Sequence, residues 1–151
     1  MNENLLHLTD VSKSFGEVHA IEHVSLDIQT KSVVGLVGGN GAGKTTLLRM
    51  MAGIYKPTTG RVYLKDGKNV DQMRSVLGVV PESTGLYSKL TAWENIRFHS
   101  RIHGIEDSVA WSRTLRFAEL LDIQDSLHRY TEGFSRGMRQ KTDLLRALAH
   151  G

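Results

Sequence analysis

The sequence contains no cysteine, no long apolar run and no block of charge of one sign. Without cysteine, disulfide bonds and thiolate metal sites are excluded, and a reducing compartment such as the cytoplasm fits this composition. No stretch of about 18 consecutive apolar residues occurs, so we expect no membrane-spanning helix. Residues 1–10 lack the basic flank and apolar stretch of a secretory signal peptide. Any membrane role would therefore come through a partner.

The charge balance is only mildly basic. The 151 residues include 19 basic and 16 acidic side chains, which gives a net charge of +3 with both signs interspersed. Such a balance gives no independent reason to expect a nucleic-acid partner, and we expect none. A chain of this length suits one domain and is long enough to bury a core.

The most informative stretch is residues 38–45, Gly-Gly-Asn-Gly-Ala-Gly-Lys-Thr, which match the phosphate-binding pattern G-x-x-x-x-G-K-[ST] at every fixed position. The mostly apolar residues 33–37 before it predict a strand buried on both faces. Residues 47–51 after it predict a helix that stops near Gly53. Strand, glycine loop and helix are the context that this pattern requires. The alternative is a glycine-rich turn with a surface lysine.

The residue types of this stretch explain the chemistry. Glycines allow backbone N–H groups to point inward as an anion nest, and the following helix adds its positive N-terminal end. Lys44 would reach the β- and γ-phosphates, Thr45 would ligate Mg²⁺ and Thr46 would contact the α-phosphate. We therefore expect a nucleoside triphosphate to bind here. The candidate residues are Gly38, Asn40, Gly41, Ala42, Gly43, Lys44, Thr45 and Thr46.

The part around this loop is rich in strand patterns. Residues 5–11 and 18–28 predict strands of a mixed or antiparallel sheet, joined by a turn at 14–17. Residues 61–64 predict a short strand followed by a turn at 66–67, and residues 75–80 predict another buried strand. Phe15, in the first turn, would either stack on a base or pack within the hairpin. Both interpretations stay open on the residues alone.

The remainder of the chain predicts helices. Residues 91–94, Thr-Ala-Trp-Glu, form a capping box that starts a helix towards Gly104. A second helix begins near Asp107, and a third begins near Ser135. The second carries Trp111, Leu115, Ala118 and Leu121 on one stripe, and the third carries Leu144, Leu145 and Leu148. We therefore divide the chain into a β-rich nucleotide-binding core, residues 1–89, and a helical subdomain, residues 90–151.

A second motif begins the third helix, at residues 134–141, Phe-Ser-Arg-Gly-Met-Arg-Gln-Lys. Ser135 is a natural N-cap, and Gly137 lets a ligand approach the first helical turn. One interpretation is a second anion-binding helix N-terminus. The other is an ordinary capped helix with a basic face.

Together the two motifs resemble those of the ATP-binding subunits of ABC transporters, and the resemblance covers essentially the whole chain. Residues 38–46 look like the Walker A motif of this family, and residues 134–138 look like its signature motif. Residues 79–82, Val-Val-Pro-Glu, stand where the family has its Q-loop, and Phe15 stands where it has the aromatic that stacks on adenine. The resemblance implies an α/β fold: a P-loop NTPase-like core with an incomplete parallel sheet, an antiparallel β part and an α-helical subdomain.

The resemblance also implies cofactors and partners. ATP and Mg²⁺ would bind, with Thr45 and Glu82 as metal ligands. Ser135, Arg136 and Gly137 would contact the nucleotide held by a second ATP-binding subunit in a head-to-tail dimer. The segment 82–90 would contact a membrane-spanning transporter subunit, which places the chain on the cytoplasmic face of the membrane.

Several positions depart from the usual family pattern. Arg136 and Met138 replace the usual glycine and glutamine of the signature, and the resulting Ser-Arg-Gly-Met-Arg resembles the exporter branch. An acid such as Glu82 after the Q-loop proline is similar to that branch as well. Gly39 replaces the commoner proline of Walker A. We do not expect this sequence to identify the transported substrate.

The largest departure concerns hydrolysis. In the family, the Walker B aspartate, the catalytic glutamate and a switch histidine follow the signature helix, whereas this sequence ends at Gly151. Residues 63–66 and 120–122 are better explained as a turn and a helical stripe, and His150 lies on the signature helix. We therefore expect no catalytic residue in the chain, which would be a fragment able at most to bind nucleotide. The alternatives are a soluble ABC ATPase outside transport and a non-catalytic remnant.

Overall fold

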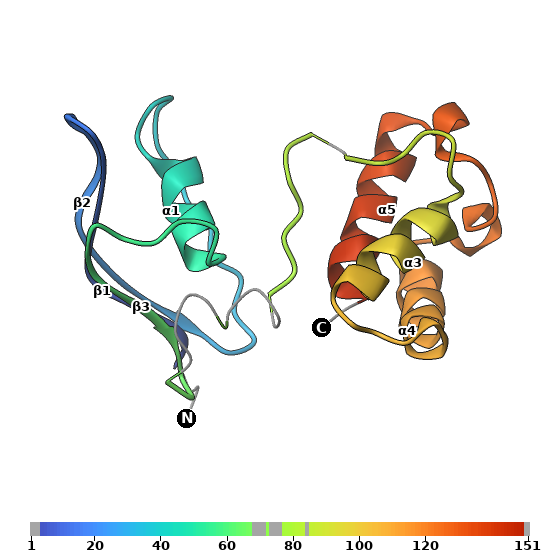
Figure 1. The fold of residues 1–151 in the computed structure, drawn as a ribbon, viewed down its shortest axis with the longest axis horizontal. Helices are drawn as coiled ribbons and strands as arrows, with labels where there is room; N and C mark the ends of the chain where they lie inside the picture. Colours follow the sequence, from blue (N-terminus) through green and yellow to red (C-terminus); the bar gives the residue numbers. More distant parts are fainter. Residues whose placement is uncertain (1–3, 68–71, 73–76, 84, 150–151) are drawn as a thin grey trace. The chain divides into compact units, whose positions relative to one another are not determined.

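The computed structural model describes residues 4–67, 72, 77–83 and 85–149, and the chain divides into two compact units, Met1–Arg74 and Ser75–Gly151 (Figure 1). The first unit contains the antiparallel sheet and one helix at the glycine loop. The second unit is helical. Both contain their own buried side chains.

The sheet of the first unit has the strand order β2-β1-β3 and is antiparallel throughout. Strand β1 (Asn4–Phe15) lies between β2 (Val18–Gln29) and β3 (Thr59–Leu64). At its centre Leu8 pairs with Leu26 on one side and with Val62 on the other. The three strands predicted at residues 5–11, 18–28 and 61–64 are confirmed, and β1 extends four residues further, to Phe15.

The core of this unit lies between the sheet and helix α1 (Lys44–Met51), which contacts both β1 and β2. Alternate strand residues and the inner face of α1 supply it, and each such side chain contributes roughly 1.5–3 kcal/mol when fully buried. Its members are Leu6, Leu8, Val11, Ile21, Leu47, Met50, Val62 and Leu64. This packing fixes the position of the first turn of α1, where the glycine loop ends.

The strand predicted at residues 33–37 is wrong for the described structure, where these residues have no strand pairing. Val33 and Val37 are almost fully exposed, at 101% and 95%. A parallel strand forms only when neighbouring strands accept and donate its backbone hydrogen bonds, and no strand in the described part of the chain lies beside this segment. Residues 77–80 likewise form no strand, while positions 75 and 76 of that prediction lie outside the described residues.

The second unit packs three longer helices against one another: α3 (Ala92–Ile102), α4 (Asp107–Leu120) and α5 (Arg136–Leu148). Two short 3-10 turns, η1 (Gln124–Ser126) and η2 (Thr131–Gly133), connect α4 to α5. The predicted starts of all three helices are confirmed. The shared core contains Ala92, Ile96, Ala118, Ile123, Leu127, Phe134, Leu145 and Ala149.

Helix α3 begins with the predicted capping box. The Glu94 amide donates to Thr91 Oγ1 at 3.1 Å, and the Thr91 amide donates to Glu94 Oε2 at 2.8 Å. The hydrogen bond from the Thr91 amide lowers the pKa of the Glu94 carboxyl. The reciprocal bonds satisfy backbone donors that would otherwise lack partners, so the helix start is fixed locally.

Helix α4 buries a slightly different face from the predicted one. Ala110, Thr114 and Ala118 are buried, whereas Leu115 of the predicted stripe is 41% exposed. Trp111 does face inward and meets Trp93 of α3 edge to face, with ring centroids 4.7 Å apart. The buried face of α4 thus keeps the predicted helical period but is rotated by about one residue from the predicted stripe.

Within the described residues, no helix is both long enough and apolar enough to cross a membrane.

Candidate functional site

The glycine loop approaches the sheet where only glycine fits. Gly41 and Gly43 have left-handed φ values of 81° and 79°. A Cβ atom at Gly43 would lie 2.3 Å from the carbonyl oxygen of Ala20 in β2. This clash could be relieved only by moving the backbone. The Ala42 amide closes the loop by donating to the Gly39 carbonyl at 3.3 Å. Glycine at position 43 therefore lets α1 start directly against β2.

The start of α1 is open to an anion. Gly43 is the N-cap and has no side chain to accept hydrogen bonds from the first turn, and that turn contains no acidic residue. Since the first amides of a helix have no intrahelical acceptor, they remain donors for a ligand beside the positive end of the helix dipole. The residues from 38 to 42 are exposed, so a ligand can reach these donors.

The Lys44 ammonium is held by its own loop. It donates to the carbonyl oxygens of Gly38 and Gly39, at 2.7 and 2.5 Å. These acceptors are neutral, so the positive charge of the ammonium is not cancelled by a carboxylate there. Thr45 is exposed and Thr46 is half-buried in the same turn. The loop thus combines a lysine charge, free helix amides and two hydroxyls, which is a donor set that fits a triphosphate.

Phe15 lies at the end of β1, where it pairs with Val18 across the hairpin. Its side chain is 46% exposed and meets the Tyr55 ring edge to face, with centroids 5.5 Å apart. The Lys13 ammonium lies over the Phe15 ring, 5.1 Å from its centroid. Phe15 is therefore held on the surface of the first unit by two side chains, and it is not part of the buried core.

The second motif forms the start of α5. Ser135 is its N-cap and accepts a hydrogen bond from the Met138 amide at 3.2 Å. Ser135, Arg136 and Gly137 are all exposed. A Cβ atom at Gly137 would meet only the Ser135 hydroxyl, at 3.9 Å, so the fold of this unit does not require glycine there. A glycine that the fold does not need, on an exposed helix start without acidic residues, fits close approach of a ligand.

Arg139 fixes the backbone that leads into this helix. Its Nη2 donates to the Glu132 carbonyl at 3.3 Å, and its Nε donates to the Phe134 carbonyl at 3.2 Å. A cavity of about 400 Å³ opens beside it within the second unit, lined by Glu82, Phe134, Arg136, Arg139 and Gln140. Glu82 and Arg136, named from different motifs, therefore share one cavity wall.

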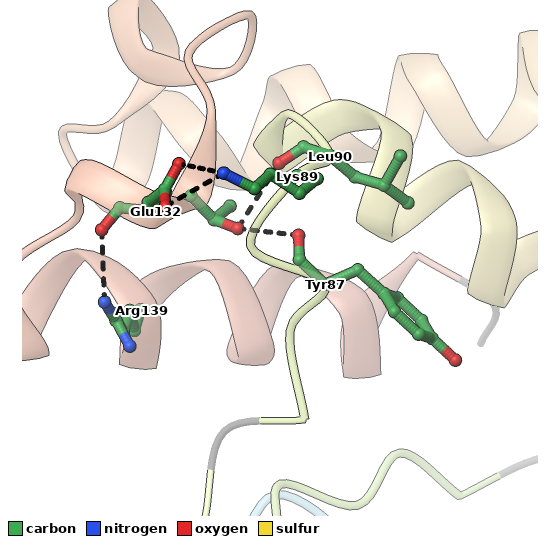
Figure 2. A network of polar contacts seen from close by, with 6 residues as sticks. Tyr87, Lys89, Leu90, Glu132 and Arg139 are labelled. Atoms are coloured by element: carbon green, nitrogen blue, oxygen red, sulfur yellow. Dashed lines mark hydrogen bonds and ion pairs between the residues drawn. The ribbon is translucent and has the colours of Figure 1, made fainter.

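A network of polar contacts joins the segment before α3 to the turn before α5 (Figure 2). Lys89 forms an ion pair with both carboxylate oxygens of Glu132, at 3.0 and 2.9 Å, and the Glu132 amide donates to the Ser88 carbonyl at 3.1 Å. Arg139 then holds the Glu132 carbonyl, as the dashed line in Figure 2 shows. The segment 87–90 and the start of α5 are thus connected through η2.

Two buried side chains anchor this network. Asn95 and Thr131 are each only 2% exposed. The Thr131 hydroxyl donates to the carbonyls of Tyr87 and Leu90, at 2.9 and 3.3 Å, while the Asn95 side chain accepts from the Tyr87 amide and donates to its carbonyl. Buried polar groups satisfied in this way hold a loop in one conformation. Segment 87–90 is therefore held by its backbone, and its Tyr87 side chain remains exposed.

Asp143 is a buried carboxyl on α5. Burial raises its pKa, and the opposite charge of Arg146, whose Nη2 lies 2.9 Å from Oδ1, acts in the other direction. Arg146 also donates from Nη1 to the Gly85 carbonyl at 3.2 Å. The backbone of Gly78 packs on Ala147, since a Cβ there would lie 2.3 Å from the Ala147 carbonyl oxygen. Helix α5 thus holds the segment that precedes α3 at two further points.

The structure gathers the predicted residues into two groups. Phe15 and the loop 38–46 lie in the first unit, and Glu82 lies with residues 135–137 in the second. Among the described residues, no group of three or more His, Cys, Asp or Glu side chains is arranged to hold a metal ion. The expected pairing of Thr45 with Glu82 around Mg²⁺ joins different units and stays a prediction.

Sequence reasoning missed three residues of these groups. Lys13 lies two positions before Phe15 on the same strand, and residues at this spacing share a face, so the signal was present. Tyr55 comes after α1, and nothing in its local sequence indicates a contact with Phe15. Arg139 was interpreted only as part of a basic helix face, whereas it holds two backbone carbonyls.

The chain is similar to known proteins of one family. A protein-family model described as "ABC transporter" matches residues 21–151. The ABC transporter ATP-binding protein NatA of Bacillus subtilis is 38% identical, over 97% of this chain and 63% of its own length. The bacitracin transport ATP-binding protein BcrA of Bacillus licheniformis is 32% identical, over 97% of this chain and 48% of its own length. The chain thus spans about half to just under two thirds of these relatives.

Solved structures give the same result for the fold. An ATP-binding subunit of an ABC transporter superposes with a TM-score of 0.81 at 26% identity, covering 95% of this chain and 61% of that one. CbiO1 of Clostridium perfringens, part of an ABC transporter complex, superposes with a TM-score of 0.85 at 21% identity, covering 98% and 62%. The fold class predicted from the two motifs is confirmed by these superpositions.

Proposed function

Since this chain belongs to the ABC transporter family of ATP-binding proteins, we propose that it binds ATP with Mg²⁺ on the glycine loop 38–46. The observation that carries the proposal is the start of α1. It has a glycine N-cap without a capping side chain, no acidic residue in its first turn and the Lys44 ammonium beside it. Together these features favour a polyanion at the start of α1.

Each loop residue has a distinct part in this proposal. The amides of the first turn of α1 donate to phosphate oxygens, and Lys44 exchanges the neutral carbonyls of Gly38 and Gly39 for charged phosphate oxygens. The Thr46 hydroxyl adds a donor to the α-phosphate. When bound, Mg²⁺ neutralises charge on the phosphates, and Thr45 and Glu82 are the residues that would hold it.

The base end of the nucleotide is assigned to Phe15. Its ring is half-exposed at the end of β1, in the same unit as the phosphate loop. A base stacked on an exposed aromatic ring gains about 1–3 kcal/mol of binding free energy. These residues bind and orient the nucleotide, and none of them removes a proton from an attacking water.

We further propose that the start of α5 serves a second subunit. Ser135, Arg136 and Gly137 are exposed, the N-terminal end of α5 is positive, and the fold leaves the glycine position open. These properties support contact with the terminal phosphate of a nucleotide held by another copy or a homologue. A head-to-tail dimer is the arrangement in which each subunit gives its α5 start to the other.

The partner in the membrane is assigned to the segment 82–90. Thr131 and Asn95 hold the backbone of residues 87–90 in place, and the exposed Tyr87 ring remains available for contact. In this proposal the chain couples ATP binding to transport, peripherally on the cytoplasmic face, through a membrane-spanning subunit. The exporter-type signature, Ser-Arg-Gly-Met-Arg, supports export.

Nucleotide binding is tested by isothermal titration of the chain with Mg-ATP. We expect the Lys44→Ala variant to weaken binding by about 10- to 100-fold, because a charge-assisted hydrogen bond to phosphate is lost. Lys31→Ala, which removes an exposed charge just after the C-terminal end of β2, should leave the affinity for Mg-ATP unchanged. Equal affinities for wild type and Lys44→Ala would contradict the proposed site.

A further inference from the structure

The proposed function assigns the base to Phe15 without explaining what holds that ring in place. An exposed aromatic side chain ordinarily samples several rotamers, and a ligand that stacks on it must bear the cost of ordering it. In this structure the ring of Phe15 is held by contacts from two other parts of the first unit. We infer that Lys13 and Tyr55 are positioning residues for the nucleotide base, because they hold the Phe15 ring with part of its surface open.

Lys13 covers one side of the ring. Its ammonium lies 5.1 Å from the Phe15 centroid and 6.0 Å from that of Tyr55, and it donates to the Lys56 carbonyl at 2.9 Å. The carbonyl is a neutral acceptor, so the charge that faces the two rings is retained. A cation over an aromatic face is attracted to its π electrons, and this attraction restrains both groups.

Tyr55 supports the ring from another direction. The two ring planes meet at 72°, an edge-to-face arrangement in which the edge of one ring contacts the face of the other. Tyr55 is itself fixed, because Arg49 Nη1 donates to its hydroxyl at 3.1 Å and its amide donates to the Arg49 carbonyl at 3.1 Å. The Arg49 guanidinium also lies over the Tyr55 ring, at 5.6 Å.

These contacts connect the two ends of the proposed nucleotide site. Arg49 lies in the last turn of α1, whose first turn is the phosphate-binding end. Ile21, which pairs with Lys13 across the hairpin, reaches the position that a Cβ atom of Gly43 would occupy. The Phe15 ring is thus connected to the last turn of α1 through Tyr55. The hairpin that carries Phe15 also contacts the start of α1, because Ala20 and Ile21 of β2 pack against Gly43. Base and phosphates would meet a preformed site.

Lys13 and Tyr55 contact only part of the Phe15 ring and leave the rest of its surface open. Despite the contacts with Lys13 and Tyr55, Phe15 remains 46% exposed. The ammonium on one face draws π electron density towards itself, so the remaining surface repels the electron-rich face of a purine less. The expected ligand chemistry is a planar heteroaromatic base attached to a polyphosphate. Stacking alone does not distinguish one purine from another, so ATP and GTP should depend on Lys13 equally.

This inference rests on the proposed nucleotide site, and the experiment separates the two. Titration calorimetry of the whole chain compares Mg-ATP with Mg-tripolyphosphate, which has the phosphates and lacks the base. Lys13→Met and Tyr55→Leu are each expected to weaken Mg-ATP binding by about two- to fivefold. Both should leave tripolyphosphate binding unchanged, and this unchanged binding also shows that the variants are folded. Lys13→Arg keeps the charge and should keep the wild-type ATP affinity.

The control for net charge is Lys31→Met, which should change the affinity for neither Mg-ATP nor Mg-tripolyphosphate. If Lys13→Met weakens ATP and tripolyphosphate equally, the lysine acts on the phosphates and the inference is overturned. It is also overturned if both variants bind ATP as wild type does, or if wild type binds the two ligands equally well. A wild-type chain that binds neither ligand overturns the proposed nucleotide site itself.

Discussion

At the scale of single residues, Asp10 and His23 occupy an irregular part of the β1–β2 ladder. Both have left-handed backbones, with φ values of 50° and 51°, although neither is glycine. The Asp10 amide donates to the Ser25 hydroxyl and the His23 amide donates to the Ser12 hydroxyl, each at 3.0 Å. These bonds replace ladder hydrogen bonds and bring the His23 ring to 2.8 Å from the Asp10 carboxylate.

This pair predicts a histidine with a raised pKa. The hydrogen bond to the Asp10 carboxylate, and then its negative charge, raise the pKa of His23 above the ordinary value of 6.5. A raised pKa in the folded state means that the pair stabilises the fold fully at pH values below the ordinary pKa, and that this contribution is lost as the pH rises through the folded pKa. NMR titration of the His23 ring measures this pKa. Asp10→Asn should lower the pKa, and an unchanged value would exclude the pair as its cause.

The residue scale also shows where sequence reasoning succeeds. Lys44 and Gly43 could be predicted because the pattern is contiguous and each position has a chemical reason. Tyr55 could not, because its contact with Phe15 depends on how α1 packs on the sheet. The hydrogen bonds of Arg139 could not be predicted either, because its partners are backbone carbonyl groups, which every residue has.

At the scale of elements, helix starts were predictable and the parallel strand was not. The capping box at Thr91 and the N-cap at Ser135 are closed within four residues, so local sequence determines them. The apolar residues 33–37 have the composition of a buried strand. A strand also needs neighbours in space, and the described part of the chain provides none beside it.

The turn between η1 and α5 depends on one buried hydroxyl, and this gives a stability prediction. In Thr131→Val the shape is kept, while the carbonyls of Tyr87 and Leu90 lose a donor inside the protein. Both carbonyls keep other donors, so we expect the free energy of unfolding of the second unit to fall by about 0.5–1.5 kcal/mol, measured by urea denaturation.

Thr114→Val is the matched control, because Thr114 is equally buried, at 1% exposed, and its hydroxyl donates to the Ala110 carbonyl of its own helix. That bond lies within one helical turn, whereas the Thr131 hydroxyl joins η2 to segment 87–90, so the loss should be smaller. Equal losses for the two variants would show that Thr131 has no special part in holding segment 87–90.

At the scale of the whole molecule, the exposed segment 33–37 predicts self-association of the chain. Val33 and Val37 are almost fully exposed, and unpaired apolar segments with high β propensity recruit other chains as strands. The double variant Val33→Thr, Val37→Thr should shift the chain from oligomers towards monomer, as measured by sedimentation or light scattering at equal concentration.

Leu120→Thr is the control, since Leu120 is 75% exposed at the end of α4, where the backbone is already hydrogen-bonded. It should leave self-association unchanged. A monomeric wild-type chain with one sharp thermal transition would contradict the prediction.

The edge-to-face pair Trp93–Trp111 has a practical consequence for such measurements. The chain has two tryptophans, and both lie between α3 and α4 of the second unit. Tryptophan emission therefore follows the melting of one half of the protein, whereas circular dichroism records both halves. Divergence between the two signals during denaturation would reveal that the halves lose their structure separately, without attaching any dye.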